Sequence, residues 1–181
     1  MDTIERIQSW FDVAIPNPTP DAWQPQLAVH IEEFTEMLVD GLGFDSDGDT
    51  AKELAHLQWY YKNKNDLNEP NDLMLLDSLA DQIVTAIGIA KMRGYDIAGA
   101  VKEVAQSNES KFYYAGVGDL SDHEWGDLNA ICKEIEAQER YKGVGWERHG
   151  EWIVFKDKNG KILKNPRTYR EPELSGSIGG K

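Results

Sequence analysis

Apolar residues recur every three or four positions along most of the chain, which is the spacing of an α-helix. Near the start, Ile4, Ile7, Phe11 and Ala14 follow this spacing, and similar stripes continue to about residue 139. Residues three and four apart lie on one helix face, so each stripe predicts an amphipathic helix. The predicted helices cover residues 3–14, 23–42, 49–63, 72–93, 97–111 and 121–139.

Turn-forming residues stand where these helices should end. The second predicted helix is followed by "GLGFDSDGD", in which Gly and Asp favour a helix stop and a turn. Gly94 ends the fourth helix, and Asp96 can cap the fifth. Ser121, with Glu124 three residues later, predicts a capping box at the start of the last helix.

The last forty residues have a different pattern. "EWIVFKDKNGKILK" places two β-prone runs around "DKNG", which predicts a hairpin. "LSGSIGGK" is small and polar, and we expect it to be mobile. The fold class is therefore mostly α, an antiparallel helical bundle with a small C-terminal β-hairpin appendage. We expect a helical core over residues 1–112, a helical insertion over 113–145, and a hairpin with a flexible tail over 146–181.

Composition limits the classes of function. The chain has 181 residues and a formal net charge of −13, which argues against broad contact with a nucleic-acid polymer. Nucleotides remain possible ligands, because cations can bridge an acidic side chain to a phosphate. The single cysteine, Cys132, excludes an internal disulfide and a thiolate zinc cluster.

Targeting signals are not evident in the sequence. The first ten residues lack the basic start and apolar run of a signal peptide. The longest apolar stretch contains two Asp and would span a membrane badly. We therefore expect a soluble cytoplasmic protein without membrane contact.

Acidic residues gather on one face of the second predicted helix. Glu32, Glu33, Glu36 and Asp40 fall within about 100° of one another on a helical wheel, opposite the apolar stripe. Taken alone, this pattern is typical of a solvated acidic face. We assign Asp40, at the end of the group, to solvent.

The fourth predicted helix makes a second interpretation possible. Asp77 and Asp81 are its only charged residues between positions 73 and 90, and apolar side chains cover the rest of its circumference. Such a pattern predicts a buried helix. Burial of an unpaired carboxylate costs on the order of several kcal/mol unless a Lys, an Arg or a metal ion compensates. Carboxylates without His or Cys partners suit Mg²⁺, with Mn²⁺ as a possible substitute, although a structural Asp pair is the alternative.

Three segments in this order resemble a known family. "QLAVHIEEFTEML", "LLDSLADQIVTAIGIA" and "VKEVAQSNESKF" together are similar to the MazG-like, all-α nucleoside triphosphate pyrophosphohydrolases, in their phage and bacterial phosphoribosyl-ATP pyrophosphohydrolase-like branch. The resemblance covers about residues 23–112. The family pattern is E-E-x-x-E followed by E-x-x-D. Glu32, Glu33 and Glu36 fill the first part and Asp81 the last position, but Ser78 replaces the second-motif Glu, and Asp77 is its expected substitute.

The resemblance implies an activity and a set of site residues. Family members bind Mg²⁺ through these carboxylates and cleave an NTP or dNTP to the monophosphate and pyrophosphate. It implies Glu33, Glu36, Asp77 and Asp81 as metal ligands and Glu32 or Glu33 as the catalytic group that orients water. It also implies a homodimer or homotetramer, in a bacterium or as a phage protein in the host cytoplasm.

Other residues are candidates for binding the substrate. The resemblance implies that Asn108 and Lys111 contact the phosphates; a frayed polar helix end is the alternative. Aromatic rings can stack on a base and amides can read its edge. This chemistry makes Trp23, Gln26, His30, Gln58, Trp59 and Tyr60 candidates, with helix packing the favoured interpretation of Trp59 and Tyr60.

Two further functions stay open from the sequence. A (p)ppGpp or phosphoribosyl-ATP hydrolase would use the same scaffold. A non-catalytic acidic module, such as a nucleotide-binding partner or a DNA mimic, would keep the fold without turnover, and Ser78 favours this alternative.

Overall fold

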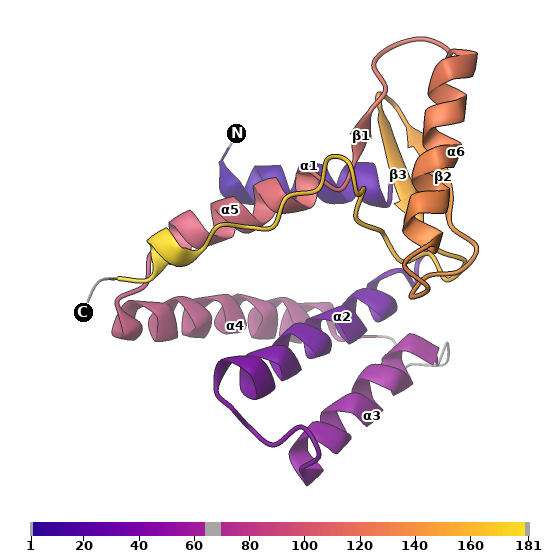
Figure 1. The fold of residues 1–181 in the computed structure, drawn as a ribbon. Coiled ribbons are helices and arrows are strands. Elements are labelled where there is room, and N and C mark those ends of the chain that lie inside the picture. The colour runs from indigo at the N-terminus through magenta and orange to yellow at the C-terminus, as the bar shows by residue number, and fades with distance from the viewer. Residues whose placement is uncertain (1, 64–69, 180–181) are drawn as a thin grey trace. The chain divides into compact units, whose positions relative to one another are not determined.

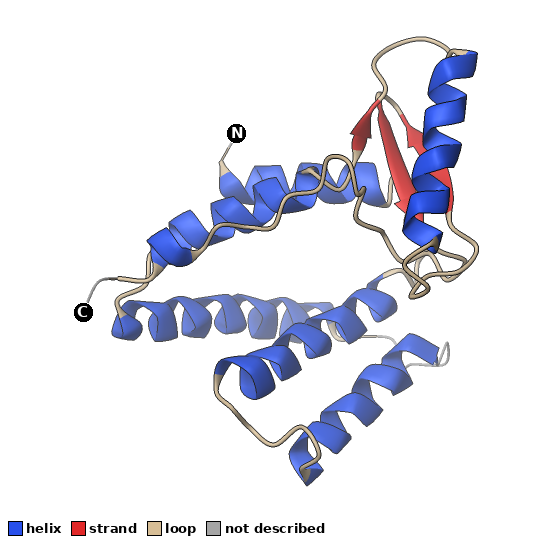
Figure 2. Ribbon diagram, in the orientation of Figure 1, coloured by secondary structure: helices blue, strands red, loops and turns tan. Residues whose placement is uncertain are grey.

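The computed structural model describes residues 2–63 and 70–179 of the chain. The chain divides into a helical unit, Asn17–Leu75, and a sheet unit, Met1–Pro16 with Leu76–Lys181. The described residues form six α-helices and one three-stranded antiparallel sheet (Figures 1 and 2), which confirms a mostly α fold with a small β part. The boundaries expected at residues 112 and 145 do not coincide with this division.

The helical unit contains α2 (Trp23–Glu36) and α3 (Asp49–Asn63), which pack against each other. The helix expected over residues 23–42 changes character at Glu36, since Met37–Gly41 continues as a π-helix. Gly43 then ends the segment with φ of +73°, a left-handed conformation that Gly adopts without a Cβ clash. The N–H groups of Gly43 and Phe44 donate to the carbonyls of Val39 and Leu38, so the last turn is satisfied.

Two helices of the sheet unit, α1 (Thr3–Ala14) and α5 (Ile97–Glu109), pack side by side. Asp96 caps α5 as predicted, because its side chain accepts a hydrogen bond from the N–H of Gly99. The helix ends at Glu109, two residues earlier than predicted. Beyond it, the N–H of Lys111 donates to the carbonyl of Asn108, so the chain turns more tightly than in an α-helix.

The core of the sheet unit lies between α6 (Asp122–Glu136) and the sheet. Its strands are β1 (Tyr113–Tyr114), β2 (Gly145–His149) and β3 (Trp152–Lys156), in the order β1-β3-β2. Ser121 and Glu124 form the predicted capping box at the start of α6. The fully buried large apolar side chains of this core are Leu128, Ile131, Ile135, Ile153, Phe155 and Leu163. The segments expected to be an insertion and an appendage therefore share one hydrophobic core.

Of the two strands predicted for the hairpin, the first forms as β3, but its main partner is β2 and not the segment after "DKNG". β3 pairs along its length with β2 across a turn at Gly150, whose φ is +62°. The "DKNG" turn does form, since the Asp157 carboxylate accepts from the N–H groups of Asn159 and Lys161. Beyond it the chain makes only an isolated bridge between Lys156 and Ile162. The sequence pattern missed β2 because its apolar residues alternate weakly.

The C-terminal strap, residues 163–179, lies along α5 (yellow in Figure 1). The Thr168 hydroxyl donates to the Ser110 carbonyl at 2.8 Å, and the Ser107 hydroxyl donates to the Arg170 carbonyl at 2.8 Å. Further along, the N–H of Asp96 donates to the carbonyl of Ser177. These bonds tie the strap to α5 and its cap, while residues 180 and 181 of the tail expected to be mobile lie outside the described part.

The helix α4 (Asp72–Arg93) corrects another prediction. It was expected to be buried, but Ala90 is its only buried residue. Leu73, Ile83 and Val84 are more than 60% exposed. Periodicity indicates that a helix is apolar all round, but not what covers it. By length and composition alone, α4 is also the one described helix that could cross a membrane.

Candidate metal and phosphate site

The three glutamates of the first motif lie within one turn of α2. Glu32 is half-buried, whereas Glu33 and Glu36 are exposed. Because Glu32 and Glu36 are four residues apart and Glu33 and Glu36 three, their side chains leave neighbouring parts of the helix surface. The π-helix begins directly after Glu36, at Met37. Because the π-helix covers Met37–Gly41, Asp40 is separated from the three glutamates by a change of helix geometry.

A hydrogen bond across the helical unit holds the Glu32 side chain. Gln58 on α3 donates from Nε2 to Oε2 of Glu32 at 3.0 Å. An amide donor fixes the plane of a carboxylate without neutralising its charge. Glu32 is thus positioned by the protein itself.

Asp77 and Asp81 lie one turn apart on α4, and both are exposed. Ser78, at the position of the family Glu, is exposed as well. The Thr85 hydroxyl donates to the Asp81 carbonyl at 2.9 Å, a local bond that leaves the carboxylate free to turn toward a ligand. These aspartates belong to the sheet unit and the glutamates to the helical unit. Among residues 2–63 and 70–179, no three His, Cys, Asp or Glu side chains form a preassembled metal cluster.

The predicted phosphate contacts lie at the end of α5. Asn108 is in its last turn and Lys111 just beyond it, and both are half-buried. The indole Nε1 of Trp10, on α1, donates to the Asn108 carbonyl at 3.0 Å. The Lys111 ammonium lies over the Trp10 ring, 5.9 Å from its centroid. Trp10 was not predicted to belong to the site, and no motif in the sequence gave a signal for it.

The candidates for base recognition lie on both helices of the helical unit. On α2, Trp23 is half-buried and Gln26 and His30 are exposed. On α3, Trp59 is 54% exposed and stacks on His56 with 6.1 Å between ring centroids. Trp59 therefore packs on a residue of its own helix, while about half of its surface stays exposed.

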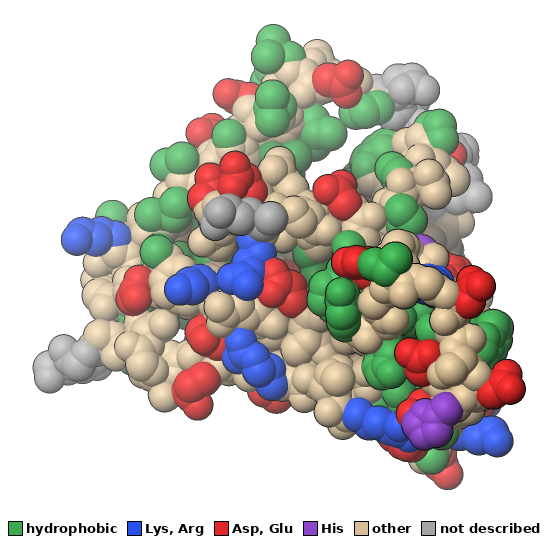
Figure 3. Space-filling model, turned by 90° about the horizontal axis from the view of Figure 1, so that it is seen from above, with side chains coloured by type: hydrophobic (Ala, Val, Ile, Leu, Met, Phe, Trp, Pro, Cys, Tyr) green, Lys and Arg blue, Asp and Glu red, His purple; other side chains and the backbone are tan. Residues whose placement is uncertain are grey.

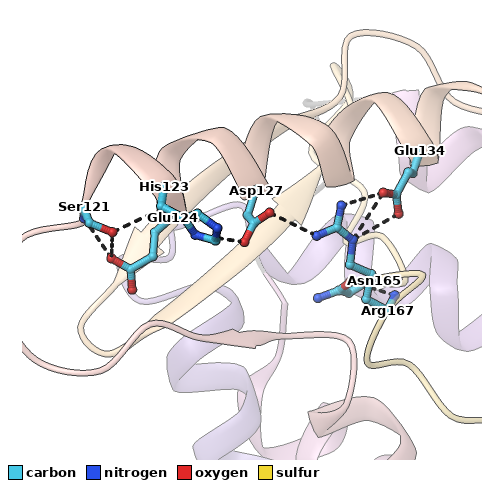
Figure 4. Close-up of polar contacts among 7 residues, drawn as sticks. All are labelled: Ser121, His123, Glu124, Asp127, Glu134, Asn165 and Arg167. Atoms are coloured by element: carbon cyan, nitrogen blue, oxygen red, sulfur yellow. Dashed lines mark hydrogen bonds and ion pairs between the residues drawn. The ribbon is translucent and has the colours of Figure 1, made fainter.

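A polar network on α6 was also not predicted (Figure 4). Arg167 of the strap donates to Glu134 and to Asp127, and His123 lies 3.5 Å from Asp127. The hydrogen bond from Arg167 lowers the pKa of Glu134. Asn165 is fully buried and its Oδ1 accepts from the N–H of Arg167. The network fastens the start of the strap to α6, and this region has a structural role.

Charged side chains of both signs share the surface. Acidic side chains are spread over the face seen in Figure 3, with Lys and Arg among them. The exposed pair Lys164 and Glu171 on the strap, at 2.9 Å, is an example. The hydrogen bond from Lys164 is the main cause that lowers the pKa of Glu171, and the charge of Lys111 adds to it. Lys111 is thus close enough to Glu171 for their charges to interact.

No protein-family model, curated protein or solved structure matches the chain.

Proposed function

We propose that the chain is a Mg²⁺-dependent nucleoside triphosphate pyrophosphohydrolase, which cleaves an NTP or dNTP between its α and β phosphates. The observation that supports it best is the acidic turn of α2, in which Gln58 holds Glu32 while Glu33 and Glu36 remain exposed. One positioned carboxylate beside two accessible ones suits a division between a base and metal ligands.

The candidate ligands fit a hard cation. Glu33, Glu36, Asp77 and Asp81 offer only carboxylate oxygens, which Mg²⁺ prefers and Mn²⁺ accepts. When bound, the cation would neutralise triphosphate charge and polarise the phosphorus under attack.

The remaining residues would position the reactants. Glu32, held through Oε2, would accept a proton from the attacking water at Oε1. The Asn108 amide would donate to a phosphate oxygen, and the Lys111 ammonium would stabilise charge on the departing pyrophosphate. Trp23, Gln26, His30 and Trp59 would contact the base or sugar. Positioning and charge stabilisation are the main requirements of phosphoryl transfer.

The exposed apolar surface of α4 supports a homo-oligomer. Large exposed apolar patches mark interaction sites in soluble proteins, and a second copy of α4 offers an equally apolar partner. A homodimer or homotetramer in the cytoplasm is therefore part of the proposal. Insertion of α4 into a membrane would instead leave Asp77 and Asp81 in hydrocarbon, at a cost of about 2.5–3.5 kcal/mol for one Asp at the helix centre.

A non-catalytic acidic module is the second candidate, favoured by Ser78 in place of a ligand and by the exposure of Asp77 and Asp81. Incubation with each NTP and dNTP, with (p)ppGpp and with phosphoribosyl-ATP distinguishes these functions. Monophosphate and pyrophosphate from an NTP or dNTP support our proposal. Turnover of only (p)ppGpp or phosphoribosyl-ATP would indicate the related hydrolases, and tight binding without turnover would indicate the module.

A further inference from the structure

Trp10 connects the first helix to the residues proposed to contact phosphate. Its indole N–H donates to the Asn108 carbonyl at 3.0 Å, and its ring carries the Lys111 ammonium 5.9 Å from the centroid. The same ring stacks on Phe112, with centroids 5.4 Å apart and an interplanar angle of 13°. One side chain therefore contacts three of the five residues from Asn108 to Phe112.

The ring of Trp10 is itself held in place. Phe112 is 6% exposed and packs with Ala14 and Val154 in a buried cluster that Trp10 adjoins. The Phe11 ring meets Trp10 edge to face at 5.0 Å. Arg6, one turn earlier on α1, pairs with Glu109. These contacts lock α1 onto the end of α5, so the indole is a rigid surface for the Lys111 side chain.

We infer that Trp10 is a positioning residue for the triphosphate: it holds the Lys111 ammonium and the end of α5 in the orientation that phosphate needs. This inference rests on the proposed function, because Lys111 is the residue through which Trp10 acts. A lysine has many rotamers, and fixing one in advance lowers the entropic cost of binding an anion. The indole face attracts the cation electrostatically and carries no formal charge of its own.

The inference predicts coupling between Trp10 and Lys111. Trp10→Leu removes both the ring and the N–H, and we expect KM for the nucleotide to rise about threefold to tenfold with kcat changed less than about twofold. Trp10→Phe keeps a ring but loses the bond to Asn108, and should fall between the wild type and Trp10→Leu. In a Lys111→Gln background, Trp10→Leu should add almost nothing to KM.

The test is a double-mutant cycle on the full chain, with Trp125→Phe as matched control. Trp125 meets Trp146 edge to face at the α6 side of the sheet, so its substitution should leave KM unchanged. The cycle is measured both as KM for the best nucleotide and as Kd for inorganic tripolyphosphate with Mg²⁺. Tryptophan fluorescence provides a direct signal, since the emission change on tripolyphosphate binding should disappear in Trp10→Phe and in Lys111→Gln.

The outcomes separate this inference from the proposed function. Each single substitution changes KM and Kd by some factor. If the double variant shows the product of the two factors, Trp10 and Lys111 act independently. Trp10 then has only a structural role and the inference is wrong, whatever the turnover. If no nucleotide is hydrolysed but tripolyphosphate binding shows the coupling, the proposed function is wrong and the positioning role stands. Absence of both turnover and tripolyphosphate binding overturns both.

Discussion

Gln58 on α3 donates a hydrogen bond to Glu32 on α2, with 3.0 Å between Nε2 and Oε2. The bond joins two segments 26 residues apart in sequence and gives the Glu32 carboxylate a donor from the neighbouring helix. Glu32 is also half-buried, whereas Glu33 and Glu36 are exposed. We therefore propose Glu32 for the attacking water and the other two glutamates for the metal.

The first prediction concerns Gln58. Gln58→Leu keeps the size of the side chain but removes the donor, so we expect kcat to fall about tenfold with little change in KM. Steady-state kinetics with the best nucleotide measures both values. Lys52→Ala, an exposed change on the same helix, is the control and should leave both unchanged. An unaltered kcat in Gln58→Leu would show that the orientation of Glu32 does not matter.

The second prediction uses Asp40 as a matched control for Glu36. Both are exposed acids near the end of the α2 segment, and only Glu36 is a proposed ligand. Glu36→Gln should lower turnover at least about a hundredfold, the typical scale for lost charge stabilisation in a transition state, while Asp40→Asn has little effect. Circular dichroism checks that both variants fold. Equal losses in the two variants would mean that net acidity, and not a specific ligand, is needed.

The third prediction addresses Ser78. If Asp77 replaces the family Glu, Asp77→Asn should reduce turnover at least about a hundredfold. Adding Ser78→Glu to that variant places a carboxylate at the family position and should restore part of the activity. Mn²⁺ binding, measured by electron paramagnetic resonance, should decrease in Asp77→Asn and recover in the double variant, in parallel with turnover. A silent Asp77→Asn substitution contradicts the proposed ligand set.

The fourth prediction concerns α4. Ile83→Glu places a charge on its exposed apolar surface and should shift the native mass, measured by light scattering after gel filtration, toward the monomer. Val117→Glu is the control, because Val117 is 89% exposed and lies outside α4. A native mass of one chain for the wild type would contradict the proposed homo-oligomer. Association of the wild type with lipid vesicles would show that α4 meets a membrane instead.

The fifth prediction concerns acid stability. Hydrogen bonds from Arg167 and Lys156 lower the pKa of Glu134 and Glu147 below that of an unfolded chain. A depressed folded pKa gives stability that is present above the unfolded value, about 4.3, and is lost as pH falls through the folded value. Urea unfolding should therefore show a decline below about pH 4.3, and a shallower one in Arg167→Gln. Equal pH profiles would mean that the Arg167 pair contributes nothing.

Sequence patterns predicted the positions of the helices well, but they did not predict strand pairing or the burial of α4. The bounds of α1, α3 and α4 agree with the predicted ranges, because periodicity and capping residues are local signals. β2 was missed, and α4 was expected to be buried, since strand pairing and coverage depend on distant segments. Interruption of the second helix by a π segment had no evident signal.

The same limit applies to the candidate site. The sequence shows acidic residues at helical spacing in α2 and α4. Their proposed roles come from the resemblance of these segments to family motifs. The contacts of Gln58 and Trp10 required coordinates, because each joins residues far apart in sequence and neither side chain belongs to a motif. The periodicity of the sequence also does not predict whether the acids of α2 and α4 bind the same ligand, since this depends on tertiary structure.

The most direct measurement is release of pyrophosphate from each NTP and dNTP by the wild type and Glu36→Gln, with Mg²⁺ and with Mn²⁺. The account predicts equal amounts of monophosphate and pyrophosphate from at least one nucleotide, with turnover at least about a hundredfold lower in Glu36→Gln. No pyrophosphate from any nucleotide with either metal would contradict it, and so would equal turnover by the two proteins.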